Sequence, residues 1–169
     1  MQGERMARVR GIAKALGQAL GGTELAQAAD TAAQLAKTDL LTDMVGEFPE
    51  LQGIMGGYYA RHDGLGDEVA HAIEDHYKPR FAGDAIPASA TGAALALADR
   101  LDTLVGIFSI GQQPSGSRDP FALRRASLGI LRIIIERNID IDLKVAIAAA
   151  AQQLALTEVL NGNLEQVLT

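Results

Sequence analysis

The residues of this chain that could do chemistry lie on two expected helices and on the loop between them. The first helix is apolar and carries two acids, Asp99 and Asp102. A loop rich in glycine and proline follows over 111–120, and the next helix presents Arg124 and Arg125. Such loops are frequent places for function because a rigid scaffold fixes their position. The acids could pair with buried cations or hold a divalent metal, and the arginines could neutralise phosphates.

Three segments carry acids and a histidine in an order that resembles the HD phosphohydrolase superfamily. They are LLTDMV (40–45), AIEDHY (72–77) and LALADRLD (95–102). In that superfamily an early histidine, a His-Asp pair after an apolar run and a late aspartate in an ADRLD-like helix meet around one or two metals. Those metals would activate water against a phosphoester. The resemblance implies a helical fold in which several helices supply the ligands.

The match to this pattern lacks two nitrogen ligands. The early histidine position falls near Arg5, and the histidine of the pair falls on Thr42. Asp43 matches the aspartate of the pair, His76 matches an optional histidine, and Asp99 matches the final acid. Two carboxylates alone would make a weak Mg²⁺ site at best. We therefore expect neither a bound metal nor a catalytic residue, and a metal-dependent nucleotide phosphohydrolase is kept as an alternative hypothesis.

The same acids have a plainer structural interpretation. Asp43 and Asp99 would be buried acids paired with Arg100, Arg5 or another cation, because buried charges persist when they are paired. His76 is expected to be solvated, or to cap the end of its helix.

A second resemblance is longer and rests on three uninterrupted segments. They are EFPELQGIMGGYYA (47–60), HYKPRFAGD (76–84) and SGSRDPFALRRASLGILRI (115–133). They are similar to the middle of the β subunit of bacterial heterotetrameric glycyl-tRNA synthetases. The resemblance covers about residues 4–155, and an HD-like helical domain is an internal part of that subunit.

This resemblance implies a fragment of a larger enzyme, glycine–tRNA ligase. Residues 1–155 would form the HD-like domain, and 156–169 an extension toward the remainder of the β subunit. The α subunit of such enzymes performs the chemistry of glycine, ATP and the adenylate, so the parent would use ATP and Mg²⁺ while this fragment needs no cofactor. The expected partners are the α subunit, the remainder of the β subunit and tRNA(Gly), in the cytoplasm. The fragment alone should be inactive.

Five basic residues are candidates for contact with the tRNA backbone, because arginine and lysine neutralise phosphates without reading sequence. Each of them could instead be an internal ion-pair partner, in which case the domain would be a helical scaffold that contacts only protein. The candidates are Lys78, Arg80, Arg118, Arg124 and Arg125.

The composition sets broad limits on fold and partners. The chain has 169 residues, 48% of them hydrophobic, which suits one domain with a sizeable core. Cysteine is absent, which excludes disulfides and thiolate zinc sites. No apolar run approaches the roughly 20 residues that span a bilayer. The net charge of −6 argues against nucleic acid as the sole partner of an isolated domain.

The hydrophobic periodicity predicts a single all-α domain of seven to nine helices. The Ala-rich helix over 88–108 should be the central one, since its small side chains allow neighbours to approach closely. Phe48, Leu51, Ile54 and Met55 are expected in the core. The predicted helices cover 4–20, 23–37, 50–61, 68–77, 88–108, 119–137 and 142–155, with a short helix in the tail. The second of them either ends near Lys37 or continues through LLTDMV (40–45).

Overall fold

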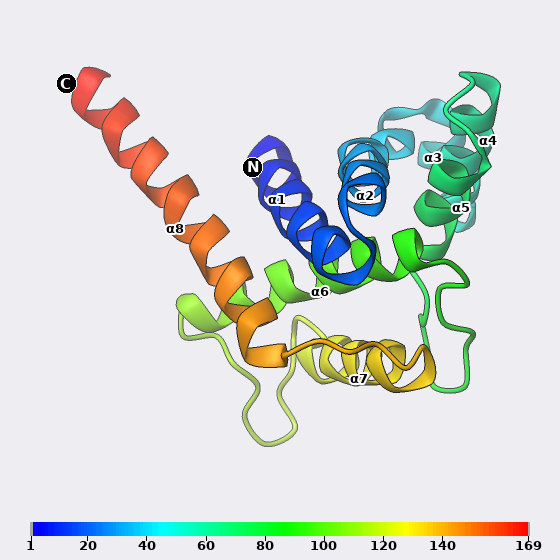
Figure 1. Ribbon diagram of the computed structural model, residues 1–169. Helices are drawn as coiled ribbons and strands as arrows, with labels where there is room; N and C mark the ends of the chain where they lie inside the picture. Colours follow the sequence, from blue (N-terminus) through cyan, green and yellow to red (C-terminus); the bar gives the residue numbers. More distant parts are fainter. Residues whose placement is uncertain (1, 169) are drawn as a thin grey trace.

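The computed structural model describes residues 2–168, with side chains described for 3–158, and its elements are helices (Figure 1). No strand occurs in this described part, where the only bridge joins Ser115 and Arg118. The predicted all-α class is therefore confirmed. The helices are α1 (Gln2–Gly21), α2 (Thr23–Leu35), α3 (Asp43–Glu47), α4 (Ile54–His62), α5 (Asp67–Asp75), α6 (Ala90–Ser109), α7 (Leu123–Glu136) and α8 (Leu143–Leu168), with 3₁₀ turns η1 (Thr38–Leu41) and η2 (Pro49–Leu51).

Helix α6 is the centre of the fold, as its composition predicts. It runs between the α1–α2 pair on one side and α7 on the other, and it also contacts α5 and α8 (Figure 1). Every residue from Thr91 to Ala98 is buried. Most of these side chains are alanine or glycine, so the neighbouring helix backbones can approach closely. The Ser89 hydroxyl accepts a hydrogen bond from Gly92 N at 3.0 Å and fixes the start of the helix.

Helices α1 and α2 form a tight antiparallel hairpin that turns at Gly22, whose φ is +83°. They approach closely at Gly17, where an added Cβ would lie 2.8 Å from the Cα of Ala26. Helix α2 buries four alanines against its neighbours. It ends at Leu35, which resolves the open question of whether it continues through the following LLTDMV segment.

A buried carboxylate, that of Asp39, organises the segment after α2. Its Oδ2 accepts hydrogen bonds from Gly53 N at 2.7 Å and Gly56 N at 3.0 Å. The inward face of α4 is made of small residues, which allows α5 to pack closely against it. Phe48 and Ile54 remain about 40% exposed, so the expectation that they belong to the core is wrong.

Helix α7 begins four residues later than the sequence indicates. The Asp119 carboxylate accepts from Leu123 N at 2.8 Å and from Arg124 N at 2.9 Å, so it caps the helix from outside. Ala122, with φ of 53°, lies between cap and helix. The Asp-Pro signal therefore marks the cap and not the first helical turn.

Helix α8 is a single continuous helix in place of the two shorter ones expected. Its first half packs through Ala146 and Ala150, and its second half extends away from the other helices (Figure 1). The boundary proposed between 155 and 156 falls within this helix and stays a prediction, and residue 169 lies outside the described residues. None of the described helices has the length and apolarity needed to cross a membrane.

Candidate functional site

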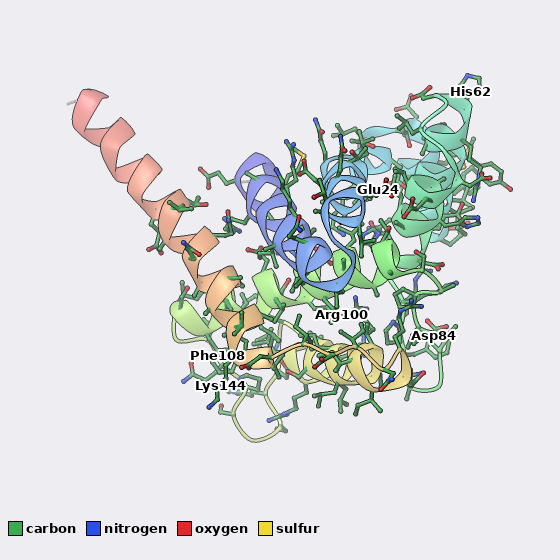
Figure 2. The ribbon with its side chains drawn as sticks, in the orientation of Figure 1. Glu24, His62, Asp84, Arg100, Phe108 and Lys144 are labelled. Carbon is green, nitrogen blue, oxygen red and sulfur yellow. The ribbon has the colours of Figure 1, made fainter. Side chains whose placement is uncertain are left out.

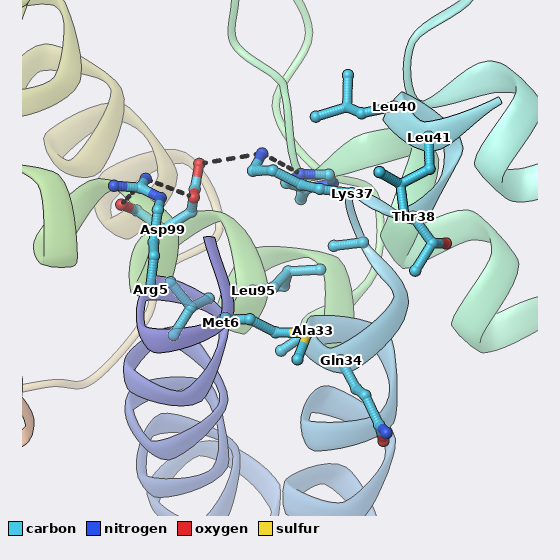
Figure 3. A pocket seen from close by; sticks show the side chains of 14 residues that line it. Arg5, Met6, Ala33, Gln34, Lys37, Thr38, Leu40, Leu41, Leu95 and Asp99 are labelled. Atoms are coloured by element: carbon cyan, nitrogen blue, oxygen red, sulfur yellow. Dashed lines mark hydrogen bonds and ion pairs between the residues drawn. The ribbon is translucent and has the colours of Figure 1, made fainter. Parts of the chain in front are cut away.

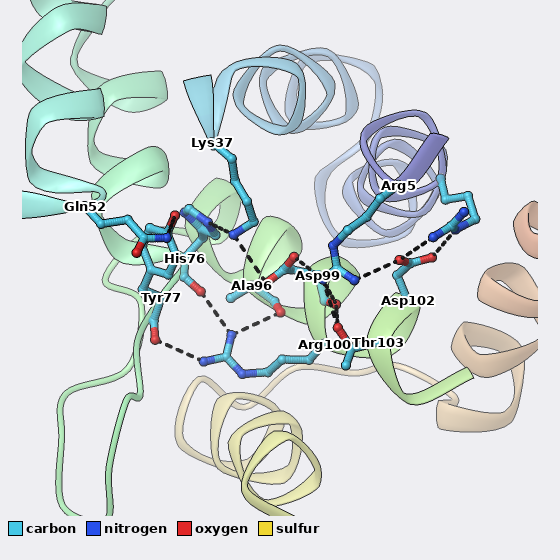
Figure 4. Close-up of polar contacts among 11 residues, drawn as sticks. Arg5, Lys37, Gln52, His76, Tyr77, Ala96, Asp99, Arg100, Asp102 and Thr103 are labelled. Atoms are coloured by element: carbon cyan, nitrogen blue, oxygen red, sulfur yellow. Dashed lines mark hydrogen bonds and ion pairs between the residues drawn. The ribbon is translucent and has the colours of Figure 1, made fainter. Parts of the chain in front are cut away.

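The two acids of α6 face arginines from the first turns of α1 (Figure 4). Asp99 Oδ1 lies 2.9 Å from Arg5 Nη2, which also donates to the Thr103 hydroxyl at 2.8 Å. Asp102 is almost fully buried, and its Oδ1 accepts from Arg8 Nε at 2.7 Å. Arg5 Nη1 lies 3.4 Å from the other oxygen of Asp102. Both carboxylates are therefore neutralised by side chains of the chain itself.

Lys37 supplies a second cation to Asp99 and was missed by the sequence analysis. Its Nζ lies 3.8 Å from Asp99 Oδ2 and 4.4 Å from the centre of the Tyr77 ring. Burial lowers the pKa of the ammonium, and the Asp99 charge partly offsets this. The sequence offers one indication of this role. Lys37 directly follows the apolar stripe of α2, a position from which its side chain can reach the core.

His76 is buried, so the expectation that it is solvated is wrong, although it does lie at the C-cap of α5. Its Nδ1 is 2.6 Å from the carbonyl oxygen of Ile73, which requires a proton on Nδ1. Nε2 therefore has a free lone pair and accepts from Lys37 Nζ at 3.2 Å. Burial, assisted by the Lys37 charge, lowers the pKa of the imidazole to about 3.

The pKa of the Asp99 carboxyl reflects opposing effects. Burial pushes it upward, but the positive charges around it, that of Lys37 first, outweigh burial and hold the pKa below its ordinary value. Asp99 is therefore ionised at neutral pH and serves as the anionic centre of the cluster.

The positions that match the HD pattern are only partly brought together. Arg5, His76 and Asp99 line the same cavity, whereas Thr42 and Asp43 do not line it. The Thr42 hydroxyl accepts from Val45 N at 3.3 Å and caps α3, and Asp43 is exposed at the first position of that helix. Asp43 is therefore not the buried acid expected. The HD resemblance of the fold stays a prediction.

No set of three or more His, Cys, Asp or Glu residues in the described part of the chain is arranged to hold a metal. The literal His-Asp pair of the sequence, His62 and Asp63, is exposed at the end of α4, far from the α6 cluster (Figure 2).

Arg100 does not pair with Asp99, the partner considered from the sequence. Its guanidinium donates to four backbone carbonyls, those of His76 at 3.0 Å, Tyr77 at 3.2 Å, Pro79 at 3.1 Å and Ala96 at 3.2 Å (Figure 4). It thereby fixes the connection after α5 against α6.

Two cavities adjoin the cluster, and His76 and Asp99 line both of them. The first, of about 230 Å³, lies between α1, the end of α2 and α6, and its walls are mostly apolar (Figure 3). The second, of about 300 Å³, lies between the connection after α5, α6 and the start of α7. Arg80, Arg100 and Arg125 line this second cavity, which gives it a basic wall.

Two of the five basic candidates are held by intramolecular contacts. Lys78 Nζ lies 3.1 Å from Asp75 Oδ1. Arg124 Nη2 donates to the carbonyl of Gly116 at 2.6 Å and so stabilises the loop before α7. Phosphate contact by either residue would compete with these bonds.

The other three basic candidates are exposed. Arg80 lies with its guanidinium carbon 5.4 Å from the centre of the Tyr77 ring. Arg118 lies in the loop before α7, and only its backbone is paired, with Ser115. The Arg125 side chain makes no hydrogen bond or ion pair within 4 Å among the described residues, although its charge acts on Asp119. Arg80 and Arg125 share the second cavity, so these two form the most coherent basic surface among the candidates.

Comparison with known proteins identifies the class as a subunit of an aminoacyl-tRNA synthetase. Residues 1–169 match the family described as "Glycyl-tRNA synthetase beta subunit", and the chain belongs to this family. The resemblance that the three long sequence segments carry is confirmed.

The relatives are named "Glycine--tRNA ligase beta subunit". The protein of Thiobacillus denitrificans is 60% identical over 157 residues, which cover 92% of this chain and 22% of the relative. That of Janthinobacterium sp. is 67% identical over 149 residues, 88% of this chain and 21% of the relative. That of Paracidovorax citrulli is 62% identical over 149 residues, with the same coverage. The chain thus spans about a fifth of the length of the curated relatives it matches.

Proposed function

We propose that this chain is a non-catalytic helical part of the β subunit of a glycine–tRNA ligase, and that it supports tRNA binding and the architecture of the subunit. Membership of the family and the names of the relatives support the parent activity. The parent enzyme would attach glycine to tRNA(Gly) in the cytoplasm, with ATP and Mg²⁺ used outside this chain. Its partners would be the α subunit and the rest of the β subunit.

The non-catalytic assignment is supported by the state of Asp99. A carboxylate that serves a metal or a substrate needs a free oxygen, but cations lie near both oxygens of Asp99: Arg5 at 2.9 Å and Lys37 at 3.8 Å. His76 is likewise engaged through both ring nitrogens. A hydrolytic site would have to displace these partners first, which disfavours the phosphohydrolase alternative.

The single observation that carries the tRNA hypothesis is the basic wall of the second cavity. Arg80 comes from the connection after α5 and Arg125 from α7, yet both line the same hollow. Two exposed guanidiniums on opposite elements suit a phosphodiester between them. Arg118 would extend this surface along the loop before α7.

The test uses the complete α/β enzyme with Arg80→Ala and Arg125→Ala, and with Lys14→Ala as a matched control. Lys14 is an exposed cation on α1 and lines neither cavity. We expect each arginine variant to raise the KM for tRNA and to reduce the log–log salt slope of tRNA binding by roughly one unit. Glycine-dependent ATP–pyrophosphate exchange should be unchanged, and Lys14→Ala should resemble the wild type.

Unchanged tRNA charging in both arginine variants, with normal subunit assembly, would favour the protein-only scaffold over tRNA contact. Loss of assembly in the variants would instead identify the arginines as structural. Circular dichroism and gel filtration of each variant distinguish these outcomes.

A further inference from the structure

We propose that the first cavity is a binding site for a small organic monoanion with an apolar body, and that Lys37 holds its acidic group. The two cavities share His76 and Asp99, but Lys37 and the apolar walls line the first and Arg80 and Arg125 the second, so the proposal does not rest on the proposed role in tRNA binding. It rests on the charge balance around Lys37, on the hydrogen bonding of its ammonium and on the walls of the cavity.

The positive charge of Lys37 is incompletely compensated in the described part of the chain. Asp99 is the one carboxylate within 4 Å of the Lys37 Nζ there, with its Oδ2 at 3.8 Å, and Arg5 holds the same carboxylate more closely, at 2.9 Å from Oδ1. His76 is neutral because its Nε2 is an acceptor. A partly buried ammonium that shares its counterion with an arginine favours an additional anion.

The hydrogen bonding of this ammonium is also incomplete. An ammonium has three donors, and His76 Nε2 is its one partner within hydrogen-bond distance in the described part of the chain. Asp99 Oδ2, at 3.8 Å, contributes charge but is too far for a hydrogen bond. Lys37 therefore retains donor capacity, and it lines the cavity (Figure 3).

The rest of the cavity wall suits an apolar body. Met6 and Val9 come from α1, Leu40 and Leu41 from η1, and Leu95 from α6. Leu41 is 89% exposed, which is unusual for a leucine and leaves an apolar surface next to the cavity that a ligand could cover. A volume of about 230 Å³ accommodates a small ligand. One charged end and apolar walls select a monoanion with a hydrocarbon portion over inorganic phosphate or a neutral lipid.

The methionines of the chain provide a direct test. We would label the methionine methyls with ¹³C in the 169-residue protein and titrate octanoate at pH 7.5 while recording NMR spectra. Met6 lines the cavity, whereas Met44 and Met55 lie outside it and report on unspecific adsorption. We expect the Met6 methyl signal to shift saturably, with no matching shift of the other two. 1-Octanol, which lacks the charge, and acetate, which lacks the body, should each bind at least about tenfold more weakly.

Substitution of Lys37 separates the charge from the apolar walls. Lys37→Met should weaken octanoate binding at least about tenfold while binding of 1-octanol is retained, and Lys37→Arg should keep saturable octanoate binding. Lys14→Met, which removes an exposed charge outside the cavity, should behave as the wild type. Absence of a saturable Met6 shift, equal affinity for octanoate and 1-octanol, or equal octanoate affinity in Lys37→Met would each overturn the proposal. The comparison of octanoate with 1-octanol uses the wild-type protein alone. It therefore tests the proposal even if a substitution of Lys37 impairs folding.

Discussion

The buried imidazole of His76 should make the stability of this protein fall on mild acidification. In the unfolded chain a histidine titrates near pH 6.5, whereas burial and the adjacent Lys37 lower the pKa of His76 to about 3 in the folded protein. Between these values the unfolded state binds a proton that the folded state does not. Stability is therefore fully present above pH 6.5 and is lost progressively as the pH falls below it.

The magnitude follows from the linkage relation. Each pH unit below 6.5 costs about 1.4 kcal/mol from this one group, so the free energy of unfolding should drop by about 2 kcal/mol between pH 7.5 and pH 5. Urea denaturation followed by circular dichroism at several pH values within that window measures the loss. The window is chosen because Asp99, whose pKa is lowered, stays ionised throughout it.

Two variants make this prediction specific to His76. His76→Asn retains a side-chain donor near the Ile73 carbonyl but cannot be protonated, so it should lose most of the pH dependence between pH 7.5 and 5, whatever its absolute stability. His71→Asn is the control, because His71 lies on the same helix but is exposed. If His76→Asn and the wild type lose stability in parallel over this window, the imidazole is not the group responsible and the reasoning fails.

Further predictions concern packing and buried polar contacts, each checked by urea denaturation. Gly17→Ala should lower the free energy of unfolding by about 1–3 kcal/mol, because its Cβ would meet backbone atoms of α2. Gly106→Ala is the control: its Cβ would enter open space, so it should be neutral or raise the free energy of unfolding by up to about 1 kcal/mol. Equal effects of the two substitutions would contradict the close approach of α1 and α2. Asp39→Ala should lower the free energy of unfolding by about 2–4 kcal/mol, because it leaves two backbone N–H groups unpaired. Asp39→Asn keeps an acceptor oxygen and should lower it less. A larger loss of stability in Asp39→Asn than in Asp39→Ala would refute the assigned hydrogen bonds. Arg8→Met should lower the free energy of unfolding by about 2–3 kcal/mol, because it leaves the charge of the buried Asp102 poorly compensated. The double variant Arg8→Met/Asp102→Leu should recover part of that loss. If the stability losses of the two single variants simply add in the double variant, the pairing of Arg8 with Asp102 is refuted.

Local sequence patterns were sufficient to predict the helices but not all of their ends. The alanine run in α6 predicts a buried central helix because small side chains on several faces admit several neighbours. The start of α7 was placed too early because Asp119 caps it from four residues upstream. Asp39 holds the loop before α4 through contacts between distant residues, which no periodicity encodes, and the preceding Phe48 is exposed.

The candidate site shows the same limit. The pairing of Asp99 with a cation is predictable from the sequence, because an acid on an apolar helix is stable only when its charge is compensated. Arg5, one of the partners that the sequence suggests, is the cation that lies 2.9 Å from it. The contribution of Lys37 and the burial of His76 depend on how the end of α2 meets the end of α5, and both helix ends carry weak local signals. Long-range contacts of this kind are fixed by tertiary packing, which a pattern within one helix does not report.

The four carbonyl contacts of Arg100 couple the connection after α5 to α6 and α7. Three of these carbonyls belong to the connection after α5, more than 20 residues upstream of Arg100. Gly129 of α7 lies over the same guanidinium, since a Cβ there would be 2.8 Å from Arg100 Nε. Among the described residues these carbonyls have no side-chain partner within the connection itself, so the shape of the connection depends on α6, and α7 covers the same guanidinium. In amide hydrogen exchange, the amides around Tyr77 and Lys78 should open together with the α6–α7 contact and not with the helix that immediately precedes them.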